Sequence, residues 1–245
     1  MSTKKTTTQA GNSLATVVAI DGPAGVGKST VARLIAKRLD FLFVNTGDMY
    51  RALTWRALRD GVNIRDQRAV TRFLRKRMDW RFHVHDGSLK IRLDGKELGR
   101  ELRSERVSRL TPTVAQIPAV RLVLRRLQRE LALKGSAVLE GRDTTTHVAP
   151  EAGLRIFLDA PVEERAKRRY HQLIGDGKRV KLHAIQEAVR IRDLRERKKK
   201  IMPRRLSPGT VVLDTTHLTL HDVADKIIEL YRHRKQRNAG ARRNS

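Results

Sequence analysis

Gly22-Pro23-Ala24-Gly25-Val26-Gly27-Lys28-Ser29 is the stretch that decides the fold of this chain. It matches the spacing G-x-x-x-x-G-K-[ST] at every fixed position, which is the pattern of a loop that binds phosphate groups. An apolar run, 14–20, comes directly before it, and residues 29–39 after it place their apolar side chains on one helical face. The sequence therefore predicts a buried strand, a glycine-rich loop and a helix, in that order.

The residue types in this loop suit the phosphates of a nucleoside triphosphate. Glycine allows the backbone to turn so that successive N–H groups and a helix N-terminus face the phosphate oxygens. We expect Lys28 to bridge the β- and γ-phosphates and the Ser29 hydroxyl to ligate Mg²⁺. The residues expected to bind ATP are Gly22, Pro23, Ala24, Gly25, Val26, Gly27, Lys28, Ser29, Thr30 and Arg168.

Short apolar runs alternate with helical patterns along the rest of the chain. Together with the glycine-rich loop, this alternation predicts an α/β fold with a parallel five-stranded sheet flanked by helices. Residues 80–98 change to a period of two around Asp86-Gly87, which indicates an antiparallel hairpin. The further strands are expected at 41–44, 137–140, 154–159 and 210–213, and the helices at 48–59, 67–78, 118–133, 161–173, 182–200 and 220–235.

The hairpin sits among helices, so we expect it to belong to a small inserted subdomain. This subdomain is expected at 65–110, between two parts of a core at 14–64 and 111–235. A short lid is expected near 161–181. The polar stretch 1–13 and the basic stretch 236–245 are expected to be disordered tails.

The chain of 245 residues is strongly basic, with 53 Lys and Arg against 26 Asp and Glu and a formal net charge of +27. Such a charge predicts attraction to phosphate in some form. There is no cysteine, which excludes disulfides and thiolate chemistry. Neither a long apolar run nor a secretory signal is present, so we expect a cytoplasmic protein with no membrane partner.

A second set of phosphate-directed residues lies outside the loop. Neither an Asn-Lys-x-Asp nor an Asp-x-x-Gly string occurs, which argues against a GTPase. Instead, Thr46-Gly47-Asp48-Met49-Tyr50-Arg51 follows the second strand and Gly141-Arg142-Asp143 follows the third. Arg121, Arg192 and Arg195 lie in the expected helices. Two phosphate-binding sets indicate two phosphorylated substrates, one of which accepts the phosphoryl group.

These strings, in this order, resemble the bacterial cytidylate kinases, a branch of the nucleoside monophosphate kinases. The resemblance covers roughly 14–235. It implies a P-loop kinase fold in which the inserted subdomain at 65–110 binds a nucleoside monophosphate. Its further parts are Val107-Ser108, Pro118-Ala119-Val120-Arg121, Ile156-Phe157-Leu158-Asp159-Ala160 and Glu163-Glu164-Arg165-Ala166. It implies MgATP-dependent phosphorylation of CMP or dCMP to the diphosphate by a monomer that closes around both substrates.

The resemblance also implies roles for individual residues. Arg51 and Arg142 would hold the acceptor phosphate, Thr46 and Asp143 would lie near the cytosine, and Arg121 near the base and sugar. Lys28, Arg142 and Arg192 would act on the transferring phosphoryl group. The residues expected to bind the acceptor are Thr46, Arg51, Arg121, Arg142, Asp143, Arg192, Glu196 and Lys199.

The chain departs from the family pattern on the acceptor side. Where the family reads Arg-Asp-x-x-Asp-x-x-Arg, this chain has Glu196 for the second Asp and Lys199 for the last Arg. Pro112 stands where the family has a serine near the sugar, and Thr144-Thr145-Thr146 replaces Met-Gly-Thr. These changes leave the choice between CMP and dCMP open.

Two other interpretations remain open from the sequence alone. One is a P-loop kinase for another small acceptor. The other is a nucleotide-binding protein that associates with nucleic acid and has no such kinase activity, which the charge of +27 motivates. The basic tail also suggests a weak, nonspecific RNA contact.

Overall fold

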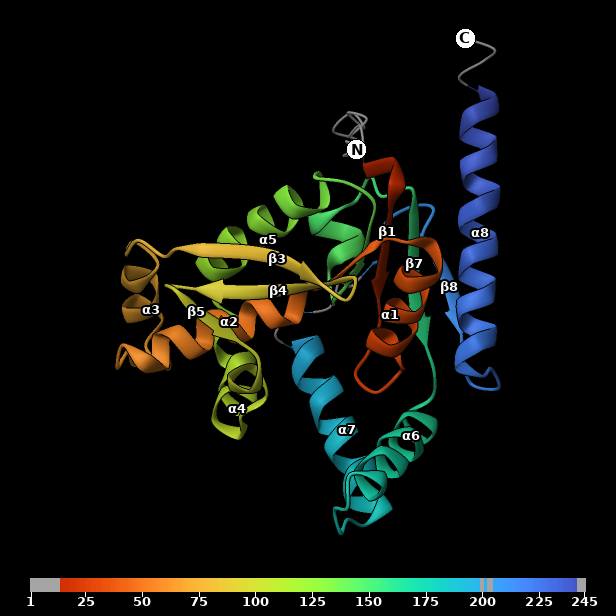
Figure 1. The fold of residues 1–245 in the computed structure, drawn as a ribbon. Coiled ribbons are helices and arrows are strands. Elements are labelled where there is room, and N and C mark those ends of the chain that lie inside the picture. Colours follow the sequence, from red (N-terminus) through yellow and green to blue (C-terminus); the bar gives the residue numbers. More distant parts are fainter. Residues whose placement is uncertain (1–13, 199–200, 202–204, 242–245) are drawn as a thin grey trace, which may run out of the picture.

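A computed structural model describes residues 14–198, 201 and 205–241, and it contains the predicted parallel sheet (Figure 1). Five parallel strands lie in the order β2-β6-β1-β7-β8. The strands are β1 (Val17–Asp21), β2 (Leu42–Asn45), β6 (Ala137–Glu140), β7 (Leu154–Asp159) and β8 (Val211–Asp214). Each bound lies within three residues of the predicted one, and the fold class is confirmed.

The central strand β1 has helices on both of its faces, and this explains its unbroken apolar sequence. Val18 and Ile20 pack with α1 (Lys28–Leu39) and α8 (Leu220–Ala241). Val17 and Ala19 pack on the other side with residues of α5 (Pro118–Ala132) and the turn that follows β6. All five β1 residues are buried, as is usual in a parallel sheet covered on both faces.

The predicted hairpin is present as β3 (Trp80–His85) and β4 (Ser88–Leu93), and a third strand, β5 (Lys96–Leu98), pairs with β4. The hairpin is not separate from the core sheet. Ser88 of β4 pairs with Phe43 of β2, so one sheet of eight strands runs through both parts of the molecule. Sequence periodicity identifies a hairpin but not the strand beside which it lies.

Around this hairpin lie α2 (Thr46–Arg59), α3 (Gln67–Phe73) and α4 (Glu105–Val114), which together with α5 enclose a second apolar core. The sequence did not predict α4. The boundary expected between residues 110 and 111 falls inside this helix, which crosses it although it contains Pro112. The amphipathic pattern was short and interrupted by proline, and the contacts of α4 with α2 support the helix.

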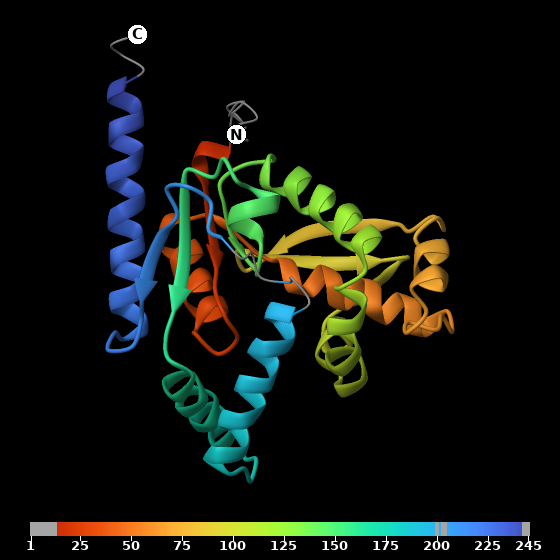
Figure 2. The ribbon, with the colours of Figure 1, turned by 180° about the vertical axis from the view of Figure 1, so that it is seen from behind.

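Two helices, α6 (Val162–Gly175) and α7 (Leu182–Lys198), form an arm that projects from the sheet (Figures 1 and 2). Helix α7 packs against α6. The lid expected near 161–181 includes α6, and whether this arm closes over a nucleotide stays a prediction.

Helix α8 continues to Ala241, six residues beyond its predicted end, so most of the stretch 236–245 expected to be disordered is helical. No proline follows position 220, and Tyr231 anchors the helix by an edge-on contact with Phe41. The expected tail 1–13 and residues 242–245 lie outside the described residues. Within the described part of the chain, no helix is long and apolar enough to cross a membrane.

Candidate active site

The phosphate loop connects β1 to α1 with the backbone geometry that its glycines permit. Gly22 has a φ of +148°, and a Cβ there would lie 2.2 Å from the Leu158 carbonyl oxygen. Gly27 has a φ of +94° and stands at the N-cap of α1, where no side chain caps the helix. Because L residues rarely adopt these values, glycine is needed at both positions. The loop leaves the helix N-terminus available for an anion.

Lys28 is buried and turns back onto its own loop. Its Nζ donates to the Pro23 carbonyl oxygen at 2.6 Å. Burial, and then the positive charge of Arg142, lowers the pKa of Lys28 to about 7, although Glu140 and Glu196 oppose the shift. The lysine predicted to hold two phosphates therefore lies in a site where its charge is costly until an anion arrives.

Ser29 and Glu140 place two oxygen ligands together beside the loop. The Ser29 hydroxyl donates to Glu140 Oε2 at 2.9 Å, and Glu140 ends β6 with 5% of its surface exposed. Mg²⁺ prefers hard oxygen ligands, and with nucleotides it takes only one or two from the protein. The pair therefore fits Mg²⁺. The sequence assigned only Ser29 to the metal, so Glu140 is a ligand that it missed.

Asp21 holds the end of β1 to the turn after β6, which the sequence did not predict. Its two carboxylate oxygens accept hydrogen bonds from the backbone N–H and the hydroxyl of both Thr144 and Thr145, at 2.7–2.9 Å. These threonines belong to the stretch that departs from the family pattern. The structure gives them a supporting role, because they fix the loop that carries Arg142 and Asp143 relative to β1.

Thr46 and Arg51 lie on α2 on the acceptor side. Thr46 is buried, and its Oγ1 donates to the Glu140 carbonyl oxygen at 2.8 Å, which ties the start of α2 to the end of β6. Arg51 Nη1 donates to Ser108 Oγ at 2.8 Å and to the Leu102 carbonyl oxygen at 3.3 Å. Arg51 therefore braces α2 against α4, with about a quarter of its side chain exposed.

Asp143 gathers two arginines from α5, of which the sequence predicted only one. Its Oδ2 lies 2.6 Å from Nη2 of Arg121 and 2.6 Å from Nη2 of Arg125. Arg125 stands four residues after Arg121 and so shares its helical face. This spacing in the sequence could have identified Arg125 as a second site residue. Two guanidinium groups compensate the buried carboxylate.

Tyr50 adds a hydroxyl to the same cluster. The side chain is buried, and among the described residues its hydroxyl has no hydrogen-bond partner. Burial, and then the charge of Asp143, raises the pKa of Tyr50 to about 12, so the hydroxyl keeps its proton. It is a donor near Arg121 and Arg125 that a ligand could use.

Arg142 and Arg192 share one carboxylate. Glu196 accepts from Arg142 Nε through Oε2 and from Arg192 Nε through Oε1, both at 3.0 Å. Burial alone would raise the pKa of Glu196, but the two arginines hold it below its usual value. Glu196 thus lies between the two cations that we expect to bind phosphate, and it joins α7 to the loop after β6.

Arg165 and Arg168 of α6 attach the arm to the phosphate loop. Arg165 donates to the carbonyl oxygens of Ala160 and Ala24, and its Nη2 lies 2.6 Å from Asp193 of α7. Arg168 Nη1 donates to Thr215 Oγ1 at 3.0 Å and to the Val26 carbonyl oxygen at 3.4 Å. Arg168, which was expected to bind ATP, is placed beside the loop.

Lys199 and Pro112 are the remaining positions of the acceptor side. Lys199 lies outside the described residues. Pro112 lies within α4, and the neighbouring Thr111 hydroxyl donates to the Val107 carbonyl oxygen at 2.7 Å. The Thr111 hydroxyl therefore donates within its own helix and does not take the place of the family's serine.

Taken together, the parallel sheet, the glycine loop between β1 and α1 and the arginines facing it define a P-loop kinase fold. The chain belongs to the cytidylate kinase family, whose sequence profile matches residues 18–233.

Two curated relatives illustrate this membership. The cytidylate kinase of Bacillus licheniformis is 38% identical over 213 residues, which cover 87% of this chain and 94% of the relative. The bifunctional pantoate ligase/cytidylate kinase of Synechococcus sp. (strain JA-2-3B'a(2-13)) is 42% identical over 231 residues. The match takes in 92% of this chain but only 42% of that longer protein.

One solved structure, the shikimate kinase of Bacteroides thetaiotaomicron, aligns over 87% of this chain and 96% of its own. The TM-score is 0.44 and the sequence identity is 12%. This likeness is too distant to bear on the activity.

Proposed function

We propose that this chain transfers the γ-phosphoryl group of ATP to CMP or dCMP and releases ADP with CDP or dCDP. One observation carries the proposal beyond family membership. Arg142 and Arg192 lie near enough to Lys28 to lower its pKa, so the loop for the donor and the arginines for the acceptor form one electrostatic site. Phosphoryl transfer needs such an arrangement, because its transition state is stabilised by position and by positive charge.

Each group in this site has a simple role in the proposal. Lys28 and the backbone N–H groups of the loop hold the β- and γ-phosphates. Arg142 and Arg192 leave Glu196 and turn toward the acceptor phosphate and the transferring group, which a guanidinium can bind through two parallel hydrogen bonds. The attacking atom is an acceptor phosphate oxygen that is already anionic at neutral pH. No separate general base is needed.

Ser29 and Glu140 would hold Mg²⁺ with ATP. The ion would neutralise charge on the β- and γ-phosphate oxygens when it is bound. The residues around it keep the two oxygen ligands in place, because Glu140 is buried at the end of a central strand and Ser29 lies in the first turn of α1.

Recognition of the acceptor nucleoside would fall to the cluster on α2 and α5. Asp143, Arg121 and Tyr50 offer acceptors and donors for the base, as the family resemblance implies for the first two. The sugar contact is the weakest part of the pattern, because Glu196 is engaged with two arginines and the Thr111 hydroxyl with its own helix. We therefore expect CMP and dCMP to be used with similar efficiency. All of these groups come from one chain, in agreement with a monomer.

A panel of acceptors tests the proposal. Purified protein with MgATP is given CMP, dCMP, UMP, AMP or GMP, and ADP release is followed in a coupled assay. We expect turnover with CMP and dCMP at least tenfold above the other three. Folded protein that turns over none of the five would overturn the proposal, and a preference for AMP or GMP would point to a different acceptor at the same site.

A further inference from the structure

The outer face of α3 carries positive charge that the proposed reaction does not use. Arg65, Arg68, Arg72 and Arg75 are spaced by three, four and three residues, which places them on one side of the helix and its flanking turns. Lys76 lies beside them. Val70 and Phe73 occupy the opposite, buried side. These five cations form what we call the α3 basic face.

The charges of this face are largely uncompensated within the described chain. The guanidinium groups of Arg65, Arg68, Arg72 and Arg75 form no hydrogen bond or ion pair with any residue in that part, and all four side chains are exposed. Lys76 lies 3.6 Å from Asp60. Asp66, which shares a shallow hollow with Arg68 and Arg72, caps α3 by accepting from two backbone N–H groups.

This face is too far from the phosphate loop to serve the nucleotides there. The 14 residues of α2 run from Thr46, in the candidate active site, to Arg59. At about 1.5 Å per residue this is roughly 20 Å. Figures 1 and 2 both place α3 at the outer end of α2, on the side of the molecule opposite to α8.

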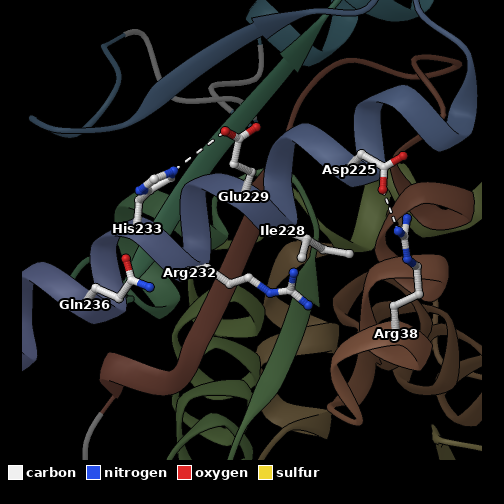
Figure 3. A pocket seen from close by; sticks show the side chains of 7 residues that line it. All are labelled: Arg38, Asp225, Ile228, Glu229, Arg232, His233 and Gln236. Atoms are coloured by element: carbon white, nitrogen blue, oxygen red, sulfur yellow. Dashed lines mark hydrogen bonds and ion pairs between the residues drawn. The ribbon is translucent and has the colours of Figure 1, made fainter.

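On α8, part of the positive charge is compensated. The hollow between α1 and α8 contains Arg38 and Arg232, but carboxylates alternate with them (Figure 3). Asp225 pairs with Arg38, and Glu229 lies 3.6 Å from His233. Further along α8, Arg232, Lys235 and Arg237 are exposed and form no ion pair with any described residue, so α8 is the rival surface from which the test must separate the α3 basic face.

We propose that the α3 basic face binds the phosphodiester backbone of a nucleic acid without sequence selectivity. Arg68 and Arg72 lie on α3, and Arg65 and Arg75 lie on its flanking turns, so four guanidinium groups follow one side of residues 65–75. A nucleic acid strand carries one negative charge at every nucleotide and can neutralise several of these cations at once. The chain is only 4% aromatic, and α3 itself exposes no aromatic residue on which bases could stack. Contacts to phosphate alone fix position but do not read sequence. This inference stands whether or not the chain phosphorylates CMP.

The test compares two variants with the same change in charge. Fluorescence anisotropy follows a fluorescein-labelled RNA of 20 nucleotides, and a DNA duplex of equal length, between 50 and 300 mM KCl. Arg68→Gln/Arg72→Gln/Arg75→Gln removes three cations from the α3 basic face. Arg232→Gln/Lys235→Gln/Arg237→Gln removes three from α8. Circular dichroism and a thermal melt establish that both variants are folded.

We expect the wild-type protein to bind with a dissociation constant on the order of 10 µM at low salt. The α3 variant should bind at least tenfold more weakly, and its slope of log K against log salt for RNA should fall by about 2. The α8 variant should change the affinity by less than about twofold. The ratio of the affinity for the RNA to the affinity for the DNA duplex shows which of the two nucleic acids the α3 basic face prefers.

Several outcomes would overturn the proposal. Equal losses in the two variants would mean that RNA responds to net charge alone, and no binding by the wild type at 50 mM KCl would remove the site. Release of RNA by MgATP and CMP would place it in the nucleotide site. Tighter binding of labelled polyglutamate than of RNA would indicate an acidic protein as partner. ADP release with CMP should be unchanged in the α3 variant, which separates this test from that of the proposed function.

Discussion

The phosphate loop and the acceptor side are built for the same chemical group by different means. The loop is main chain between a buried strand and a helix, and its shape depends on glycines whose φ values other residues rarely adopt. The acceptor side is made of side chains from α2, α5, α7 and the turn after β6. Its arginines are held by Glu196 and Asp143, and in our proposal the acceptor phosphate displaces Glu196 from Arg142 and Arg192.

In our proposal, this difference separates a preformed loop from an acceptor side that rearranges. A phosphate that enters the loop takes Lys28 from the Pro23 carbonyl oxygen. On the acceptor side the phosphate has to replace the Glu196 carboxylate. Its binding free energy is therefore the gain from pairing with the arginines minus the loss of their ion pairs with Glu196. We therefore expect acceptor binding to be coupled to the arm, because Glu196 belongs to α7.

The largest effect is expected at the loop. Lys28→Ala removes the cation that bridges the donor phosphates and should lower kcat by on the order of 10²- to 10³-fold. Lys37→Ala, on an exposed position of the same helix, is the matched control and should leave kcat unchanged. Steady-state kinetics with CMP measures both. A Lys28→Ala enzyme with near wild-type kcat would contradict the assignment.

On the acceptor side, Asp143→Asn removes the charge that holds Arg121 and Arg125. A hydrogen bond to a charged group contributes about 1.5–3 kcal/mol, so the KM for CMP should rise roughly 10- to 100-fold while the KM for MgATP stays within about twofold. The control is Glu130→Gln, which changes the exposed ion pair between Glu130 and Arg126 on α5, the helix that carries Arg121 and Arg125. Equal increases in both KM values would show that the two sides are not separable in this way.

The pKa of Lys28 predicts a pH dependence that belongs to the loop alone. Near pH 7 and above, the free enzyme loses the Lys28 proton, whereas a bound triphosphate favours the charged form. Binding above pH 7 must therefore take up a proton, and the affinity for MgATP should fall by up to about tenfold per pH unit between 7 and 9. Calorimetry in buffers of different ionisation enthalpy measures the uptake. The dependence should disappear in Lys28→Ala, and its persistence there would assign it to another group.

The smallest effect is expected at Glu196, where the carboxylate competes with the acceptor phosphate. Glu196→Gln keeps the shape but removes the charge, and it should lower the KM for both CMP and dCMP about threefold. Glu187→Gln, an exposed position of the same helix, is the control. If instead the KM for CMP rises and that for dCMP does not, Glu196 contacts the ribose, and the acceptor side resembles its family more closely than we propose.

Much of the fold followed from local patterns. The strands of the parallel sheet are buried on both faces and so appear as short apolar runs, and the phosphate loop is recognisable because its residues are contiguous. Helix α4 and strand β5 were missed because their patterns are short and their support comes from contacts with α2 and β4. The early end assigned to α8 was wrong because composition, not helical periodicity, was the basis for the expected tail.

The sequence by itself determined the class of fold, the phosphate loop and the family, and it predicted which arginines would bind an acceptor phosphate. Only the tertiary structure decided how these residues are paired. Asp21 is 123 positions from Thr144, and Arg142 is 54 positions from Glu196. No periodicity links residues at such separations, because their proximity results from the packing of strands and helices and not from local conformation. For the same reason, the position of the excess charge on the outer face of α3 became visible only in three dimensions.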